Sequence, residues 1–147
     1  MDDIKKATPE DKATLCINHA LEDLMAAKLT LCNGLYNASC NRAYYAVYHT
    51  IRAVLALDNK EFKQHSETIG HYRHEFLKTE YLDRACSDTI KATSQLRTSC
   101  DYDDFYSATK EEVEKAIALA ESFYNYNKQY IDERMCGSIG RYDKFEI

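Results

Sequence analysis

One helical run carries side chains that could handle a phosphate group: residues 41–49 read Asn-Arg-Ala-Tyr-Tyr-Ala-Val-Tyr-His. Seven residues turn an α-helix by almost two full revolutions, so Arg42 and His49 share one face, with Tyr45 between them. Arginine can grip a phosphate through two parallel hydrogen bonds and keeps its charge. Histidine titrates near neutral pH and can take or give a proton. We therefore predict catalytic roles for Arg42 and His49.

Polar and aromatic neighbours surround this pair. Asn41, Tyr45 and Tyr48 follow the i, i+4, i+7 spacing of one helix face. We predict that these three side chains bind a nucleotide or RNA. The spacing leaves a structural alternative open, because tyrosine rings also fill the cores of helical bundles and an arginine often pairs with a carboxylate of the next helix.

A second candidate region begins at Arg97 and continues into the acidic, aromatic stretch 101–105. Its three aspartates could suggest a calcium loop, but the glycine and glutamate that an EF-hand needs at its sixth and twelfth positions are missing. We expect Asp101 to pair with an arginine of the helix that contains residues 41–49 and, together with Tyr102, to fix this loop. Such a pair is mainly architectural, yet it can also orient a functional arginine.

A third region, residues 65–75, could either bind a metal ion or form a solvated helix face. The region holds three histidines and two glutamates, at positions 65, 67, 71, 74 and 75. His71 and His74 are i, i+3 neighbours, but zinc would need further ligands from elsewhere, and the order differs from H-E-x-x-H. We expect a solvated helix face here and predict neither a metal nor a cofactor. The sequence also contains no P-loop, G-x-G-x-x-G or G-x-S-x-G motif.

Helices must position these groups, since no segment alternates polar and apolar residues as a strand does. A start signal at 8–11 and a stop at 33–34 bound the first predicted helix, and a second covers about 37–57. A short helix is capped at 66–68, another runs from about 81 through 96, and a capping box at 109–112 opens the last. The predicted fold class is all-α: an antiparallel bundle of four long helices plus one short helix.

Length and composition agree with this class. The chain has 147 residues, enough for one domain, which we place at 1–135 with a C-terminal tail at 136–147. Only 4 Gly and 1 Pro are present, which disfavours turn-rich β folds. A net charge of −5 argues against a broad basic surface for nucleic acid but permits a small local one.

The expected cellular location depends on whether the sequence contains a membrane span or a secretory signal. No stretch approaches the roughly 18 apolar residues of a membrane span, and the N-terminus has no secretory pattern, so we expect a cytoplasmic protein without membrane contact. The 6 cysteines should then be reduced, and most should act as small buried hydrophobic residues.

Several segments also carry a resemblance to a known family over residues 10–132. They are 34–36 (Gly-Leu-Tyr), 41–46 (Asn-Arg-Ala-Tyr-Tyr-Ala), 52–57 (Arg-Ala-Val-Leu-Ala-Leu), 65–66, 76–79, Arg97, 101–106 and the helix that begins at Thr109. In this order and spacing they resemble the HEPN domain, the small four- to five-helix domain of prokaryotes, in its stand-alone branch.

The resemblance implies a homodimer and a role near nucleotides or RNA. Many HEPN proteins are metal-independent ribonucleases, often toxins paired with a minimal nucleotidyltransferase antitoxin. Their motif is an arginine, four to six residues and a histidine, which Arg42 and His49 satisfy. In the toxin branch the motif lies near a later helix end, where this sequence has Arg97 and Tyr102 but no histidine. Either the Arg42–His49 pair serves as the catalytic pair, or the domain binds without cutting. Arg97 is expected to bind the nucleotide or RNA.

Three functions follow from the resemblance. The first is a metal-independent ribonuclease or toxin component, in which His49 acts as general base or acid on the 2′-hydroxyl reaction and Arg42 stabilises the phosphorane. The second is a non-catalytic helical dimer that binds a nucleotide or a partner protein. The third is a dimeric antitoxin-like or regulatory protein. An exposed His49 beside Arg42 would favour the first, and a His49 packed under tyrosine rings the second.

Overall fold

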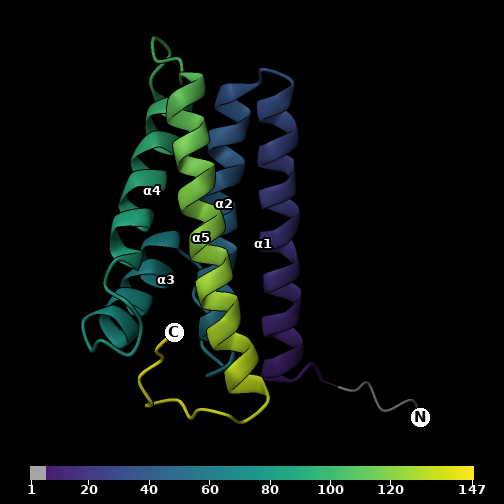
Figure 1. The fold of residues 1–147 in the computed structure, drawn as a ribbon, viewed down its shortest axis with the longest axis vertical. Coiled ribbons are helices and arrows are strands. Elements are labelled where there is room, and N and C mark those ends of the chain that lie inside the picture. The colour runs from purple at the N-terminus through teal and green to yellow at the C-terminus, as the bar shows by residue number, and fades with distance from the viewer. Residues whose placement is uncertain (1–5) are drawn as a thin grey trace.

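The computed structural model describes residues 6–147, which form a bundle of helices (Figure 1). The helices are α1 (Pro9–Cys32), α2 (Tyr36–Ala56), α3 (His65–Tyr72), which continues into the π-helical turn η1 (Arg73–Leu77), α4 (Cys86–Tyr102) and α5 (Lys110–Met135). Successive long helices run in opposite directions, and α2 packs against α1, α4 and α5. The prediction of an all-α bundle of four long helices and one short helix is confirmed.

Two long helices begin at the residues that the sequence indicated. Thr8 and Thr109 each accept a hydrogen bond from the backbone N–H three residues on, and the Asp11 and Glu112 carboxylates each accept one from the threonine N–H. These reciprocal bonds satisfy donors that a helix start would otherwise leave unpaired. Gly34, with φ of 75°, makes the turn between α1 and α2.

The cap of α5 gives a measurable contribution to stability. Replacing Thr109 by alanine removes the acceptor for the Glu112 N–H, and we expect the free energy of unfolding to fall by about 1 kcal/mol. Urea unfolding followed by circular dichroism measures this change. Thr98→Ala, at an exposed position within α4, is the matched control and should change stability by less than half as much. Equal losses in the two variants would contradict a specific role for the cap.

Helix α4 differs from its prediction. It begins at Cys86 rather than at about residue 81, and it has 17 residues. Glu80 has φ of 62°, a conformation that no α-helix contains. The Leu82 N–H donates to the Phe76 carbonyl, and the Tyr81 carbonyl accepts from the Phe145 N–H instead of a helical partner. The C-terminal tail therefore uses a backbone group that a longer α4 would have consumed.

Large aromatic side chains fill the core between α3, η1 and α5. Tyr72, Phe76 and Tyr130 are fully buried. The Tyr72 hydroxyl donates to Asn127 Oδ1 at 2.7 Å, and Asn127 Nδ2 donates to the Phe123 carbonyl at 2.8 Å. Because both polar groups have partners, this buried pair avoids the cost of unsatisfied hydrogen-bonding groups.

The tail after α5 folds back under the bundle (Figure 1). Phe145 is buried, and the Arg141 guanidinium lies 4.1 Å from the centre of the Phe76 ring. The carboxylate of Asp58, which follows α2, forms ion pairs with Arg141 Nε at 2.6 Å and with Arg134 Nη2 at 2.8 Å. One carboxylate thus joins the end of α2, the end of α5 and the tail.

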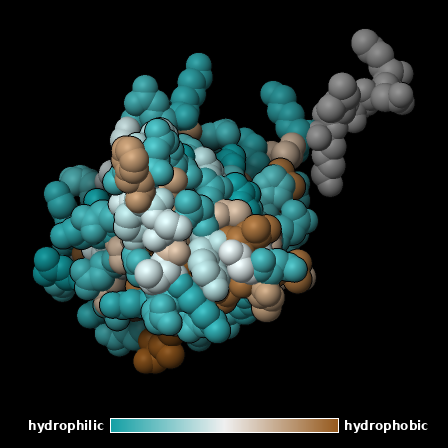
Figure 2. Space-filling view, turned by 90° about the horizontal axis from the view of Figure 1, so that it is seen from above, coloured by the Kyte–Doolittle hydropathy of each residue, from teal (hydrophilic) through white to brown (hydrophobic). Residues whose placement is uncertain are grey.

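The outer surface is mostly hydrophilic when the bundle is seen from the end at which the α1–α2 turn and the α4–α5 loop lie (Figure 2). Hydrophobic residues lie there singly or in small groups, which is normal for a folded chain. Within residues 6–147, no helix combines the length and the apolar character needed to cross a membrane. The 6 cysteines are free, and Cys16, Cys40 and Cys86 are buried.

Candidate functional site

Helix α2 places the two predicted catalytic side chains on one face. The Arg42 guanidinium lies 4.9 Å from the centre of the Tyr45 ring, and the Tyr45 and His49 rings are 5.9 Å apart. Both residues also reach Asp23 of α1: Arg42 Nη1 lies 2.8 Å from its Oδ1, and His49 Nε2 lies 3.6 Å from its Oδ2. Arg42, Tyr45 and His49 therefore lie on one face of α2, as predicted. The Asp23 carboxylate of α1 contacts both Arg42 and His49.

Asp23 is a residue that the sequence reasoning did not single out. It lies within the turns of α1 that bury Ala20, Leu24 and Ala27, so it occupies the border of the helix face turned toward α2. The sequence could have indicated Asp23 only as a carboxylate at the border of the apolar face of its helix. This position predicts that Asp23 faces a neighbouring helix, but it does not predict which cation Asp23 contacts.

A second carboxylate joins α2 to α4. Asp101 Oδ2 accepts from Arg97 Nε at 2.9 Å and from Asn41 Nδ2 at 3.2 Å. We expected Asp101 to pair with an arginine of α2, and this is wrong: its arginine is Arg97 of its own helix, four residues earlier, while Arg42 is taken by Asp23. Tyr102 is 73% exposed, and its ring centre lies 5.9 Å from the Arg97 guanidinium.

Arg97 brings α4 into contact with the tyrosines of α2. Its guanidinium lies 4.9 Å from the Tyr44 ring centre and 5.6 Å from that of Tyr45. Cations over tyrosine faces are attracted by the ring quadrupole. The structure thus places Arg97 beside Tyr45 and, through their shared Asp101 carboxylate, close to Asn41.

His65, considered above as a histidine of the candidate metal region and within the segments of the family resemblance, also belongs to this site. Its Nδ1 is 2.9 Å from the Tyr44 hydroxyl, and its ring stacks on Tyr48 with centres 3.9 Å apart. Residue 65 is the first of α3, so the loop 57–64 must bring it back onto α2. That return depends on the loop path, which no local spacing predicts.

Arg52 completes the group. Its Nη1 lies 3.2 Å from His49 Nδ1, and its Nη2 lies 3.8 Å from Glu61 Oε1. It lies one helical turn after His49, at i+3, a spacing that the sequence shows plainly. We call the set the arginine–tyrosine cluster: Arg42, Tyr44, Tyr45, Tyr48, His49, Arg52, His65 and Arg97.

The His49 imidazole is neutral at neutral pH. Burial lowers the pKa of His49 to about 4, and the charges of Arg52 and Arg42 and the nearby His19 and His65 act in the same direction. Burial also raises the pKa of the Asp23 carboxyl above its usual range, although Arg42 opposes this shift. An ion pair between the two would have moved both values the other way. At 3.6 Å their contact is therefore that of a neutral ring beside a carboxylate.

This shift predicts a pH-dependent stability. Between pH 6.5, the usual pKa of histidine, and about 4, the unfolded chain binds a proton at His49 that the folded protein does not bind. The free energy of unfolding must therefore fall as the pH is lowered through this window. We expect the wild type to lose about 3 kcal/mol more than His49→Gln between pH 7 and pH 4. Urea unfolding at a series of pH values measures the difference, and parallel curves for the two proteins would contradict it.

The other imidazole of the cluster is paired with a phenol that keeps its proton. Burial raises the pKa of Tyr44 to about 12, with Arg97 opposing the shift. Burial, Arg97 and Arg52 lower the pKa of His65. The Tyr44–His65 contact therefore joins a neutral phenol to a neutral imidazole, close to the guanidinium groups of Arg97 and Arg52.

No group of three or more histidine, cysteine or acidic side chains in residues 6–147 is placed to hold a metal ion. The three histidines of residues 65–75 each contact a different group. The His71 ring lies 5.0 Å from that of Phe62, His74 Nδ1 lies 3.3 Å from Glu75, and His65 lies on Tyr48.

His49 is neither open nor sealed. Its side chain is 18% exposed, and its ring packs beside Tyr45 and Tyr48 at 5.9 and 5.5 Å and edge-on to His19 at 5.6 Å. Its two nitrogens face Arg52 and Asp23. The ring is therefore held in one orientation by groups on α1 and α2.

Comparison with known proteins gives a consistent result. The HEPN domain model matches residues 13–130. "Putative toxin MJ0605" of Methanocaldococcus jannaschii is 33% identical over 117 residues, covering 80% of this chain and 87% of that protein. A "UPF0332 protein" of Thermotoga maritima is 28% identical over 114 residues, covering 78% and 86%.

A solved structure shares the fold. The crystal structure of ST0689, described as an archaeal HEPN homologue, superposes with a TM-score of 0.60 at 20% identity, over 82% of this chain and 98% of that one. The family model spans α2, α3 and α4 in full and most of α1 and α5, and it includes every residue of the arginine–tyrosine cluster. The chain belongs to the HEPN domain family.

Proposed function

We propose that this chain is a toxin-type HEPN protein that binds RNA with the arginine–tyrosine cluster and cleaves it without a metal ion. The observation that carries the proposal is the convergence of three guanidinium groups, two neutral imidazoles and three tyrosines from α2, α3 and α4. Guanidinium groups bind phosphate, and aromatic rings stack on unpaired bases. The family, and the name "Putative toxin MJ0605" of the Methanocaldococcus relative, support a toxin role.

The proposed reaction is attack of an RNA 2′-hydroxyl on the adjacent phosphate. His49 takes the hydroxyl proton as general base, because its imidazole is neutral at neutral pH. Its Nδ1 is engaged by Arg52, and a phosphate that binds Arg52 would release this nitrogen. Arg42 stabilises the charge of the phosphorane. The neutral His65 gives a ring N–H proton to the leaving 5′-oxygen and takes the Tyr44 hydroxyl proton on its Nδ1, and the proton held by His49 restores Tyr44 at the end of the cycle. The products are a 2′,3′-cyclic phosphate and a 5′-hydroxyl.

A second function, binding without cleavage, is favoured by the packing of His49. Both nitrogens of its ring face protein groups, and the tyrosine rings leave only 18% of the side chain exposed. In this alternative the cluster holds a nucleotide or RNA, and Asp23 and Asp101 fix the arginines as a rigid anion-binding surface.

One experiment separates the two functions. Purified protein is incubated with 5′-labelled RNA in excess EDTA, and the fragments are tested for cyclic phosphate ends. We expect cleavage by the wild type, a loss of at least 100-fold in His49→Ala, and no loss in His74→Ala, whose side chain is 72% exposed outside the cluster. RNA binding without any cleavage would support the second function. A protein that neither binds nor cleaves RNA would overturn both functions.

We also propose the assembly that the family resemblance implies: a homodimer that pairs with a minimal nucleotidyltransferase as antitoxin. A dimer would bring two clusters to one assembly, and a partner that covers them would block RNA. Light scattering of the purified chain tests the dimer. Growth arrest on expression of this chain alone, relieved by co-expression of a minimal nucleotidyltransferase, tests the pairing.

A further inference from the structure

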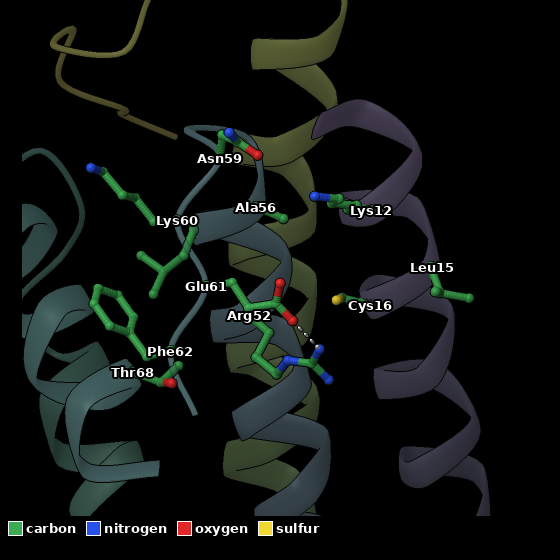
Figure 3. A pocket seen from close by; sticks show the side chains of 11 residues that line it. Lys12, Leu15, Cys16, Arg52, Ala56, Asn59, Lys60, Glu61, Phe62 and Thr68 are labelled. Carbon is green, nitrogen blue, oxygen red and sulfur yellow. Dashed lines mark ion pairs between the residues drawn. The ribbon is translucent and has the colours of Figure 1, made fainter. Parts of the chain in front are cut away.

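A pocket of about 310 Å³ lies beside the arginine–tyrosine cluster (Figure 3). It is bounded by the first turns of α1, the last turns of α2, the loop 57–64 and Thr68 of α3. Arg52 belongs to both places, because it lines the pocket while its Nη1 lies 3.2 Å from His49 Nδ1. A ligand in this pocket would therefore reach the guanidinium that contacts the proposed general base.

The inner part of the pocket is apolar and uncharged. Leu55, Ala56 and Cys16 are almost fully buried, and the half-buried Phe62 ring lies on the opposite side from Cys16 (Figure 3). Burial raises the pKa of the Cys16 thiol, so its sulfur carries no charge at neutral pH. This part suits a flat, weakly polar group of the size of a nucleobase.

The rim is cationic in a chain whose net charge is −5. Lys12, Arg52 and Lys60 line the pocket together with a single carboxylate, Glu61. The Lys12 ammonium points into the space between α1 and α2 (Figure 3). In the part of the chain that the structure describes, no carboxylate lies within ion-pair distance of Lys12 or Lys60. Two of the three cations are therefore available to an anion from outside.

Glu61 marks the position that such an anion would take. Its carboxylate lies 3.8 Å from Arg52 Nη2, which is long for an ion pair, and its side chain is 73% exposed. An exposed and loosely held carboxylate contributes little and can move away at small cost. A phosphate could replace it between Arg52 and Lys12.

We infer that this pocket holds one nucleotide of the RNA bound at the cluster, with the base against Phe62 and Leu55 and a phosphate between Lys12 and Arg52. The inference rests on the proposed function, because it assigns a place to a neighbour of the cleaved linkage. It also makes a prediction of its own, that single ribonucleotides bind here.

Calorimetry with the four ribonucleoside 5′-monophosphates tests the inference on the full chain. We expect at least one to bind, and inorganic phosphate and the matching nucleoside to bind at least tenfold more weakly. Lys12→Glu and Phe62→Ala should each weaken binding at least tenfold, whereas Glu61→Gln should strengthen it severalfold. Lys91→Glu, the same charge change at an exposed position of α4 outside the pocket, is the control and should leave the Kd unchanged.

Two results would overturn the inference: a Kd in Lys12→Glu and Phe62→Ala equal to that of Lys91→Glu, or inorganic phosphate bound as tightly as the nucleotide. Lys12 is exposed, so its variant tests the pocket even if Phe62→Ala folds poorly. RNA cleavage by the wild type is measured in parallel. Cleavage with pocket-independent nucleotide binding overturns the pocket alone, while pocket-dependent binding without cleavage overturns the ribonuclease and keeps the pocket.

Discussion

Arg42→Ala is expected to reduce RNA cleavage at least 100-fold, the loss typical for removal of one group that stabilises transition-state charge. The guanidinium touches Asp23, Asn41 and the Tyr45 ring, so it is held where the phosphorane would form. Arg42→Lys keeps the charge but loses the planar fork, and should recover only part of the activity. The measurement is the cleavage rate of labelled RNA in EDTA at saturating protein.

Arg84→Ala is the matched control for this prediction. Arg84 lies just before α4, its side chain is 75% exposed, and it pairs only loosely with Glu80 at 3.6 Å. We expect wild-type activity from this variant. If Arg42→Ala retained activity equal to that of Arg84→Ala, Arg42 would have no part in the chemistry. Thermal unfolding of both variants separates a lost function from a lost fold, because Asp23 loses its partner in the first.

Phe76→Ala should cause the largest loss of stability, about 4 kcal/mol in the free energy of unfolding. Phe76 is fully buried, contacts the rings of Tyr72 and Tyr130, and carries the Arg141 guanidinium on its face. Its removal leaves a cavity and releases the tail. In a domain of this size the change lowers Tm by roughly 10 °C. Calorimetry measures this shift.

Phe105→Ala provides the contrast, since Phe105 is 100% exposed at the loop between α4 and α5. It removes the same atoms from the surface, and we expect a change in Tm below 2 °C, because it leaves no cavity. Equal shifts for the two variants would contradict the packing described for η1 and α5.

Local sequence patterns predicted most of the fold. The capping boxes at Thr8 and Thr109 act over three residues, so their partners are visible in the sequence. The start of α4 was predicted five residues too early, because the tail, more than sixty residues later, binds the Tyr81 carbonyl. Such a competitor is outside the range of any helix signal.

The site likewise contains residues that local sequence patterns predict and residues that they do not. The face shared by Arg42 and His49 follows from helix geometry alone, and so does the i+3 neighbour Arg52. Asp23 and His65 arrive from other helices, and their positions depend on the register of α1 and the path of the loop 57–64. The partner of Asp101 was predicted wrongly because an arginine in its own helix lay closer than one in α2.

Asp23 and Asp101 have a consequence for kinetics. Each carboxylate already compensates one guanidinium, so the part of the cluster around Arg42 and Arg97 projects little positive potential, and the whole chain is acidic. The cationic rim with Lys12 and Lys60 is confined to the neighbouring pocket. Long-range steering then contributes little to the encounter, and few condensed cations are released when the strand docks. Such a protein would capture its strand slowly, with an affinity that falls only gently as ionic strength rises, and would be poorly retained by bulk nucleic acid.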